Sequence, residues 1–178
     1  GITLSERREP ARASTRGVGQ MIAHALSRGC RKIMLGIGGS ATNDGGIGML
    51  SALGWRFLDE SGALCGDDGA ALARVASIDA SRARPELVST SFQVACDVRS
   101  PLCGATGSTR VFGLQKGVRP EELDAVDAAM GNYAAATAAA CGRDESRTPG
   151  AGAAGGLGFA LISWFNARLC PGAAMVMD

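Results

Sequence analysis

The stretch RKIMLGIGGSATNDGG, which runs from Arg31 to Gly46, carries the strongest indication of the fold. Residues 33–35 are a short, continuous apolar run, which is typical of a strand buried on both faces. Glycines follow the run directly, and residues 42–44 (Thr, Asn and Asp) are types that cap the N-terminus of a helix. Apolar residues recur at helical spacing over residues 17–28, and Gly29 provides a stop. The order helix, strand, glycine-rich loop and helix predicts an α/β fold.

The rest of the chain continues this alternation of strands and helices. The Ala-rich segment 120–141 begins with a proline and two glutamates, which suit the first turn of a helix, and Gly142 is a natural stop. The other elements that the residue pattern predicts are strands at 55–59, 91–98 and 173–177, a short helix at 70–73 and an apolar helix at 157–169. The sequence therefore predicts a single α/β domain over residues 1–178, with a mixed sheet and flanking helices.

Composition and charge exclude several classes of protein. The chain has 178 residues, of which 46% are hydrophobic and 20% are charged, and its formal net charge is +1. Such a balanced charge gives no attraction to nucleic acid or to an anionic membrane. Aromatic residues make up only 4%, which leaves few platforms for base stacking. No apolar stretch is long enough to span a bilayer, and the first residues lack the apolar region of a signal peptide. We therefore expect a cytoplasmic protein that binds neither nucleic acid nor membrane.

The cysteines indicate a reducing compartment. They are scattered without a C-x-x-C pair, and His24 is the single histidine, so the closely spaced soft ligands of a zinc site are missing. A chain of this length can bury a real core and does not need a disulfide scaffold. We expect mostly buried free thiols at Cys30, Cys65, Cys96, Cys103, Cys141 and Cys170.

Residues 36–46 have the chemistry of an anion-binding loop. A strand that ends in a glycine-rich turn and enters a helix presents backbone N–H groups and the positive end of the helix dipole to a ligand. Asp44 adds a carboxylate that can accept a hydroxyl proton or hold Mg²⁺. In the alternative interpretation, Asn43 and Asp44 only cap the helix, and the glycines allow close packing. The candidate residues for binding a substrate or a phosphate are Gly38, Gly39, Ser40, Thr42 and Asn43.

Two nucleotide-binding motifs fit this loop poorly. No Gly-Lys-Ser/Thr follows the glycines, as a Walker A loop requires. Gly36, Gly38 and Ala41 match the loose dinucleotide fingerprint after a strand, but no acidic residue stands at the expected place on a following parallel strand. A dinucleotide-dependent enzyme is therefore a distant alternative.

Asp97 and Lys116 are further candidate site residues. Asp97 stands at the carboxyl end of the strand expected at 91–98, where ligands gather in open α/β sheets, so it is a candidate general base or Mg²⁺ ligand. Alternatively, it caps the following loop. Lys116 lies between Gly113 and Gly117 and can supply a point charge for phosphate, or it is an exposed lysine in a turn.

A second glycine run, residues 149–156, contains a G-x-G-x-x-G string. It follows a polar loop rather than a strand, so the dinucleotide interpretation fails its structural context. We interpret this run as the closely packed start of a helix that lines the same cleft as the first glycine-rich loop.

Four segments together, in their order and spacing, resemble the bacterial glycerate kinases of type I. The resemblance covers nearly the whole chain. The segments are GIGGSATNDGG at 36–46, CDV at 96–98 with Pro101, Leu102 and Gly104, VFG at 111–113 with QKG at 115–117, and PGAGAAGG at 149–156.

The resemblance implies ATP-dependent phosphorylation of D-glycerate to 2-phosphoglycerate, with ATP and Mg²⁺ as cofactors. It also implies two α/β domains, one flavodoxin-like and one inserted into it, with the active cleft between them. This chain would match mainly the inserted domain, with residues 1–16 and 171–178 as junction segments. The resemblance further implies that Ser40, Asn43 and Asp44 face the substrate or the phosphates, with Asp97 nearby.

The sequence departs from the family pattern at several places. Ser100 stands where the family usually has Asn, Leu114 where it has Pro and Val118 where it has Ala, and residues 13–19 read ASTRGVG where the family reads TTYGTG. The family's N-terminal DSFKGS segment and its C-terminal GEG-containing segment have no counterpart here, and both help to build the nucleotide side of the cleft. We therefore expect a portion of a longer enzyme, incomplete as a catalyst by itself.

The mechanism that the resemblance implies, together with the two Asp-bearing strand ends, is in-line attack of a glycerate hydroxyl on the γ-phosphate, with Mg²⁺ bridging the phosphates. Asp97 or Asp44 would orient or deprotonate the hydroxyl, and the amides of residues 36–46 would hold the anion. The alternative is a non-catalytic remnant of such a kinase that binds an anion or a sugar acid. The sequence is compatible with a homodimer.

Overall fold

The computed structural model describes residues 9–172, and its main sheet has three parallel strands. β1 (Lys32–Gly36) pairs with β4 (Ser91–Ala95), and β4 pairs with β5 (Arg168–Cys170), in the order β1-β4-β5. Gly36 lies opposite Ala95, so the carboxyl ends of β1 and β4 meet at one edge of the sheet. β2 (Arg56–Leu58) and β3 (Ser77–Asp79) form a separate antiparallel pair.

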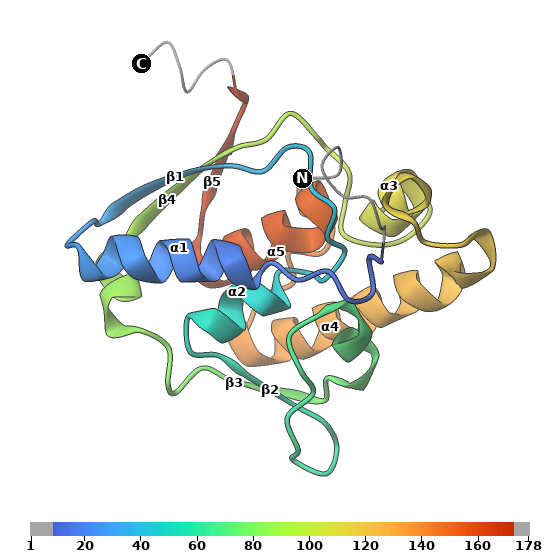
Figure 1. Ribbon diagram of the computed structural model, residues 1–178, viewed down its shortest axis with the longest axis horizontal. Helices are drawn as coiled ribbons and strands as arrows, with labels where there is room; N and C mark the ends of the chain where they lie inside the picture. Colours follow the sequence, from blue (N-terminus) through green and yellow to red (C-terminus); the bar gives the residue numbers. More distant parts are fainter. Residues whose placement is uncertain (1–8, 173–178) are drawn as a thin grey trace.

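Helices pack on one side of the parallel sheet. Figure 1 shows α1 and α5 beneath this sheet, α2 and α4 farther from it, and the β2–β3 pair at the opposite end of the molecule. α3 lies beside the loops that leave the carboxyl ends of β1 and β4 (Figure 1). The described α-helices are α1 (Arg16–Ser27), α2 (Ile47–Ala52), α3 (Ser108–Lys116), α4 (Leu123–Cys141) and α5 (Ala153–Phe165), and the described 3-10 helices are η2 (Gly69–Arg74), η3 (Pro85–Ser89) and η4 (Pro120–Glu122).

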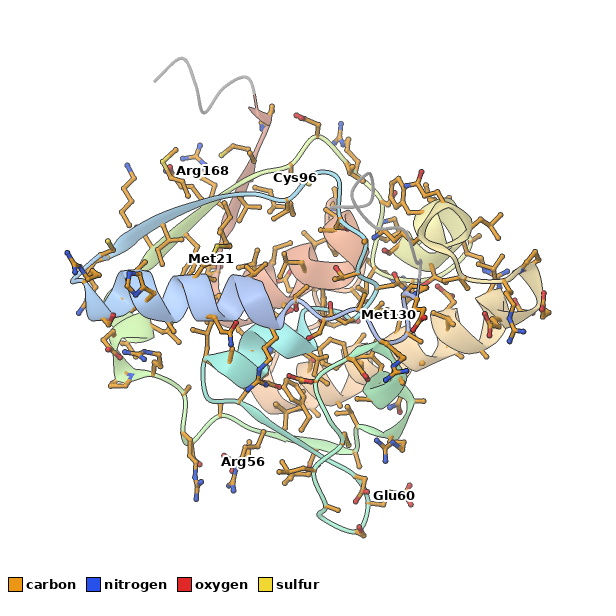
Figure 2. The ribbon with its side chains drawn as sticks, viewed as in Figure 1. Met21, Arg56, Glu60, Cys96, Met130 and Arg168 are labelled. Atoms are coloured by element: carbon orange, nitrogen blue, oxygen red, sulfur yellow. The ribbon has the colours of Figure 1, made fainter. Side chains whose placement is uncertain are left out.

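The hydrophobic core lies between the parallel sheet and the helices. Phe92 and Val94 of β4 are buried, and the ring of Phe92 stacks on that of Phe165 in α5, with centroids 4.6 Å apart. Met130 points into the core from α4 (Figure 2) and has no exposed surface. Burial of such side chains stabilises the fold by about 25 cal/mol per Å² of apolar surface removed from water. The core thus holds β4, and with it the edge from which the functional loops emerge.

Most of the predicted elements are present. The α/β fold with flanking helices is confirmed, with its parallel and antiparallel strands in two separate sheets rather than in one mixed sheet. α1, β1, β2 and β4 lie close to their predicted ranges, and α2 follows the glycine-rich loop as predicted. α4 ends at Cys141, and Gly142 adopts the left-handed conformation at its C-cap, as the glycine stop predicts. Among residues 9–172, no helix combines the length and the apolar character that crossing a bilayer requires.

Some predictions about the elements and the thiols are wrong. The helix predicted for residues 157–169 ends at Phe165, because Asn166 turns into the left-handed conformation (φ 51°), and residues 168–170 form β5 instead. The residue pattern did not reveal α3 or β3. All six cysteines are free, but of these only Cys65 is buried, so the expectation of mostly buried thiols is wrong. The strand predicted at 173–177 lies outside the described residues.

Candidate functional site

The predicted site residues gather around the edge where β1 and β4 end. The glycine-rich loop follows Gly36, and Asp97 comes two residues after the end of β4. Figure 2 labels Cys96, which marks this end of β4. The loop has two segments in different environments. We call residues 38–41 the open segment and residues 42–48 the anchored segment.

The open segment exposes its backbone. Gly38 and Gly39 are exposed, and Ser40 and Ala41 are half-buried. Gly39 has a φ of 65°, a left-handed conformation that glycine adopts without strain. Within the described part of the chain, the amide N–H groups of residues 38–41 donate no hydrogen bond. Several unpaired donors in one short segment can bind an anion.

Lys116 covers one side of the open segment. It is the last residue of α3 and is only 4% exposed. Its ammonium donates hydrogen bonds to Ser40 Oγ (2.9 Å) and to the carbonyl oxygen of Thr42 (2.7 Å). Burial lowers the pKa of Lys116 to about 8, and the negative charge of Asp44 partly offsets this effect. At neutral pH the side chain is therefore a buried cation, and the alternative of an exposed lysine in a turn is wrong.

A cavity of about 120 Å³ lies between the open segment and α3. This is well below the roughly 300–1,000 Å³ of pockets that hold larger ligands, so its size suits a phosphate group or a small acid rather than a whole nucleotide. Lys116 is the one charged side chain among its described lining residues, which makes the cavity electropositive. The lining residues are Ile37, Gly38, Gly39, Ser40, Val98, Phe112, Gln115, Lys116 and Ala154.

A larger cavity, of about 490 Å³, lies between residues 9–12, η2 and α4. Small apolar side chains make up most of its wall, and Asn43 is the only predicted site residue that lines it. Size alone favours this larger cavity. The smaller cavity, however, is lined by residues 38–40 of the open segment and by the buried cation of Lys116, and a few polar groups around a small cavity are what orient a small ligand.

The anchored segment has the opposite environment. Asn43 is 2% exposed and its side-chain amide binds to the first turn of α3. Its Nδ2 donates to Thr109 Oγ1 (3.1 Å), and its Oδ1 accepts from Ser108 Oγ (3.4 Å). The hydroxyl of Thr42 donates a long hydrogen bond to the carbonyl oxygen of Ala154 (3.5 Å). The polar atoms of both side chains are thus directed at the protein itself.

Asp44 is fully buried and accepts four hydrogen bonds from the protein. Its Oδ2 accepts from the backbone N–H and the hydroxyl of Thr15, both at 2.7 Å, and from the N–H of Gly48 at 3.4 Å. Its Oδ1 accepts from the N–H of Gly46 at 3.1 Å. Burial raises the pKa of Asp44, and these hydrogen bonds oppose the rise. Asp44 therefore caps α2 and ties it to the start of α1, without any surface open to a ligand.

The second glycine run packs against the anchored segment. Residues 154–156 all adopt left-handed conformations, and the N–H of Gly45 donates to the carbonyl oxygen of Gly155 (2.9 Å). A Cβ at Gly155 would lie 2.1 Å from the carbonyl oxygen of Thr42, so this approach requires glycine. Ala154 lines the small cavity. The predicted close packing beside the same cleft is confirmed.

Asp97 lies at the same edge of the sheet but does not line the small cavity. It is exposed, and its Oδ1 accepts from the N–H of Gly172 (3.0 Å), whereas its Oδ2 has no partner among the described residues. Residues 9–172 contain no cluster of three or more His, Cys, Asp and Glu side chains that could hold a metal ion. One exposed carboxylate still fits Mg²⁺, which proteins often bind through one or two carboxylates together with substrate phosphates.

Sequence reasoning missed two sets of residues that build this site. α3 brings Phe112 and Gln115 to the cavity. Gly117, the left-handed C-cap of α3 (φ 103°), was the signal that could have located the end of that helix. Thr15, which binds Asp44, lies 29 residues away from it in the sequence, and no local sequence pattern predicts such a contact.

Known proteins resemble this chain over almost its whole length. The model of the glycerate kinase family matches residues 1–178. The chain is 45% identical to glycerate kinase of Bacillus subtilis, over 97% of this chain and 45% of that protein. It is 42% identical to glycerate 2-kinase of Escherichia coli, over 98% of this chain and 46% of that protein. A solved structure assigned as glycerate kinase 2 from Salmonella typhimurium has a TM-score of 0.93 at 43% identity, covering 97% of this chain and 46% of that one. The chain thus spans a little less than half the length of these relatives.

Proposed function

This chain belongs to the glycerate kinase family, and we propose that the full-length protein phosphorylates D-glycerate with ATP to give 2-phosphoglycerate. The observation that best supports a site in this chain is the open segment, whose unpaired amides lie beside the buried ammonium of Lys116. The relatives named glycerate kinase and glycerate 2-kinase support the substrate and the reaction.

The open segment and Lys116 form the anion-binding part of this proposal. Amide donors and a cation that the fold already holds in place stabilise negative charge without having to reorganise. The cavity of about 120 Å³ fits the carboxylate of glycerate or one phosphate group. The nucleoside then has to bind outside this cavity. In the two-domain arrangement that we propose, with residues 1–16 and 171–178 as junctions, the other domain supplies the nucleotide side of the cleft.

Asp97 is the residue that, in this proposal, acts on the attacking hydroxyl of D-glycerate. Its exposed carboxylate, with Oδ2 unpaired among the described residues, can accept the hydroxyl proton or hold Mg²⁺. Asp44 has no exposed surface, so in this proposal it acts by holding the loop and not by accepting a proton. When bound, ATP supplies the phosphoryl group and Mg²⁺ neutralises the charge of its phosphates. The residues of this chain contribute positioning and charge, which phosphoryl transfer needs more than covalent catalysis.

The proposal includes the cellular location and the oligomeric state of the enzyme. A cytoplasmic location agrees with six free cysteines, because thiols stay reduced in that compartment. A homodimer is a separate prediction, and light scattering on the full-length protein tests it.

The experiment that tests the function is a coupled assay of ADP release by the purified full-length protein. We expect ADP release that depends on D-glycerate, with phosphorus NMR placing the new phosphate on C2. Asp97→Asn should lower kcat by about 100-fold or more, the usual contribution of a general base, with little change in thermal stability because Asp97 is exposed. Near-normal turnover in this variant would remove Asp97 from the chemistry. Binding of D-glycerate without ADP release would identify the alternative, a non-catalytic binding module.

A further inference from the structure

Lys116 bridges the two segments of the glycine-rich loop. Its ammonium contacts Ser40 in the open segment and Thr42 in the anchored segment, at 2.9 Å and 2.7 Å. These partners lie 76 and 74 residues from Lys116 in the sequence, so the bridge forms only when α3 has docked beside the loop. The conformation of the open segment therefore depends on a contact between remote parts of the chain.

The two hydrogen bonds have different consequences for an anion. Because Ser40 Oγ accepts a hydrogen from the ammonium, the hydroxyl hydrogen of Ser40 is left to donate elsewhere. Because the ammonium binds the carbonyl oxygen of Thr42, it compensates the partial negative charge that this oxygen would present to an anion.

We propose that Lys116 is a positioning residue, whose ammonium orients the hydroxyl of Ser40 as a hydrogen-bond donor and holds the Thr42 carbonyl away from the bound anion. The inference rests on the proposed function, because it takes the small cavity as the place where D-glycerate binds. In this proposal, the specificity of the site for a negatively charged group comes from the Lys116 bridge within the loop as well as from the loop amides.

The bridge requires that the buried amine of Lys116 carries its positive charge. Asp44 is the described titratable group whose charge acts on Lys116, and its carboxylate binds Thr15, Gly46 and Gly48 rather than the ammonium. The other described residues that line the cavity carry no titratable side chain. Because burial lowers the pKa of Lys116 to about 8, the ammonium is present at pH 7 and is lost as the pH rises through that value.

The experiment measures D-glycerate affinity by titration calorimetry on the full-length protein, three test variants and one control variant. We expect Lys116→Met to raise the Kd about 100-fold and Ser40→Ala about 10-fold. The double variant should bind no more weakly than Lys116→Met, because the Ser40 hydroxyl is oriented toward the anion only while Lys116 holds its oxygen, and residues that act as a unit are not additive. The control is Arg110→Met, which removes an exposed cation of α3 that pairs with Asp124 outside the cavity, and its Kd should stay within twofold of the wild type.

The wild-type protein provides a readout that does not require a folded variant at position 116. Its affinity for D-glycerate should fall as the pH rises through about 8. In Ser40→Ala this fall should begin at a lower pH, because the ammonium loses a hydrogen bond that favours its charged form.

Three results separate this inference from the proposed function. Additive effects of Lys116→Met and Ser40→Ala would overturn the positioning role, and so would an affinity that stays constant between pH 7 and pH 10. D-glycerate binding with the predicted pattern but without ADP release would refute the kinase and leave the role of Lys116 supported.

Discussion

The open segment (residues 38–41) and the anchored segment (residues 42–48) belong to one glycine-rich loop, but their amide groups have opposite surroundings. In the anchored segment, the N–H groups of Gly45, Gly46 and Gly48 donate to Gly155 and to the carboxylate of Asp44. In the open segment, no described residue accepts from the amides, and the nearest charge is the ammonium of Lys116.

The difference shows which part of a strand-loop-helix unit is available to an anion. The N-terminus of a helix is often an anion site because its amides are unpaired. Here Asp44 already occupies that position at α2, as an internal anion that the fold supplies. The available donors lie earlier in the loop, directly after β1. Substitutions in the anchored segment should therefore reduce stability, and substitutions in the open segment should reduce substrate binding.

The largest effect should come from Asp44→Ala, which removes the acceptor of four buried donors. At about 1 kcal/mol or more for each buried donor left unpaired, the free energy of unfolding should fall by about 4 kcal/mol. Urea denaturation followed by circular dichroism measures this loss. The control is Asp68→Ala at the N-cap of η2, where the carboxylate accepts from one backbone N–H, and it should cost only about 1 kcal/mol. Equal losses in the two variants would contradict the role of Asp44 as the main anchor.

A smaller loss of stability should follow Gly155→Ala. The left-handed conformation at Gly155 (φ 71°) strains any other residue by about 1–2 kcal/mol. The added Cβ would also lie 2.1 Å from the Thr42 carbonyl oxygen, so the backbone must shift. Gly142→Ala is a matched control, because Gly142 has a similar φ of 77° and no atom near its added Cβ. The midpoint of thermal unfolding should fall clearly further in Gly155→Ala than in Gly142→Ala, and equal shifts would show that the contact with Thr42 is unimportant.

The smallest change in free energy should come from Gly38→Ala, and it should appear in kinetics rather than in stability. Gly38 has an ordinary φ and open space around an added Cβ, so the fold tolerates the methyl group. Because Gly38 lines the small cavity, the methyl group should obstruct the anion and lower kcat/KM for D-glycerate about tenfold, which is roughly 1.4 kcal/mol. Gly17→Ala in α1, where the space is also open, should leave kcat/KM unchanged. An unaffected kcat/KM in Gly38→Ala would place the substrate elsewhere.

Local residue chemistry predicted much of the fold. The stops at Gly29 and Gly142 were correct because a left-handed glycine ends a helix by local geometry alone. The predicted helix extended to Leu169 although the polar residues Asn166 and Arg168 interrupt the apolar run after Phe165, and the left-handed turn at Asn166 separates α5 from β5. Asn is a residue type that adopts this conformation at helix ends, so the sequence carried a local signal that a pattern of apolar residues does not include.

The sequence predicted where the candidate site lies, but not that its loop is divided into an open segment and an anchored segment. The glycines after β1 correctly indicated where free amides would lie. An aspartate at position 44 could equally face a ligand or cap a helix. Its carboxylate is held in the capping position by a hydrogen bond from Thr15, which is remote in sequence. The environment of Lys116 likewise comes from its distant partner Ser40, so the sequence alone left both an exposed and a buried lysine open.

Amide hydrogen exchange on the full-length protein, followed by NMR, tests the division of the loop most directly. The account predicts fast exchange for residues 38–41 and slow exchange for residues 45–48 in the free protein. Saturating D-glycerate with a non-hydrolysable ATP analogue should then slow residues 38–41 strongly and change residues 45–48 little. Fast exchange at residues 45–48 in the free protein, or ligand protection there without protection at residues 38–41, would contradict the account.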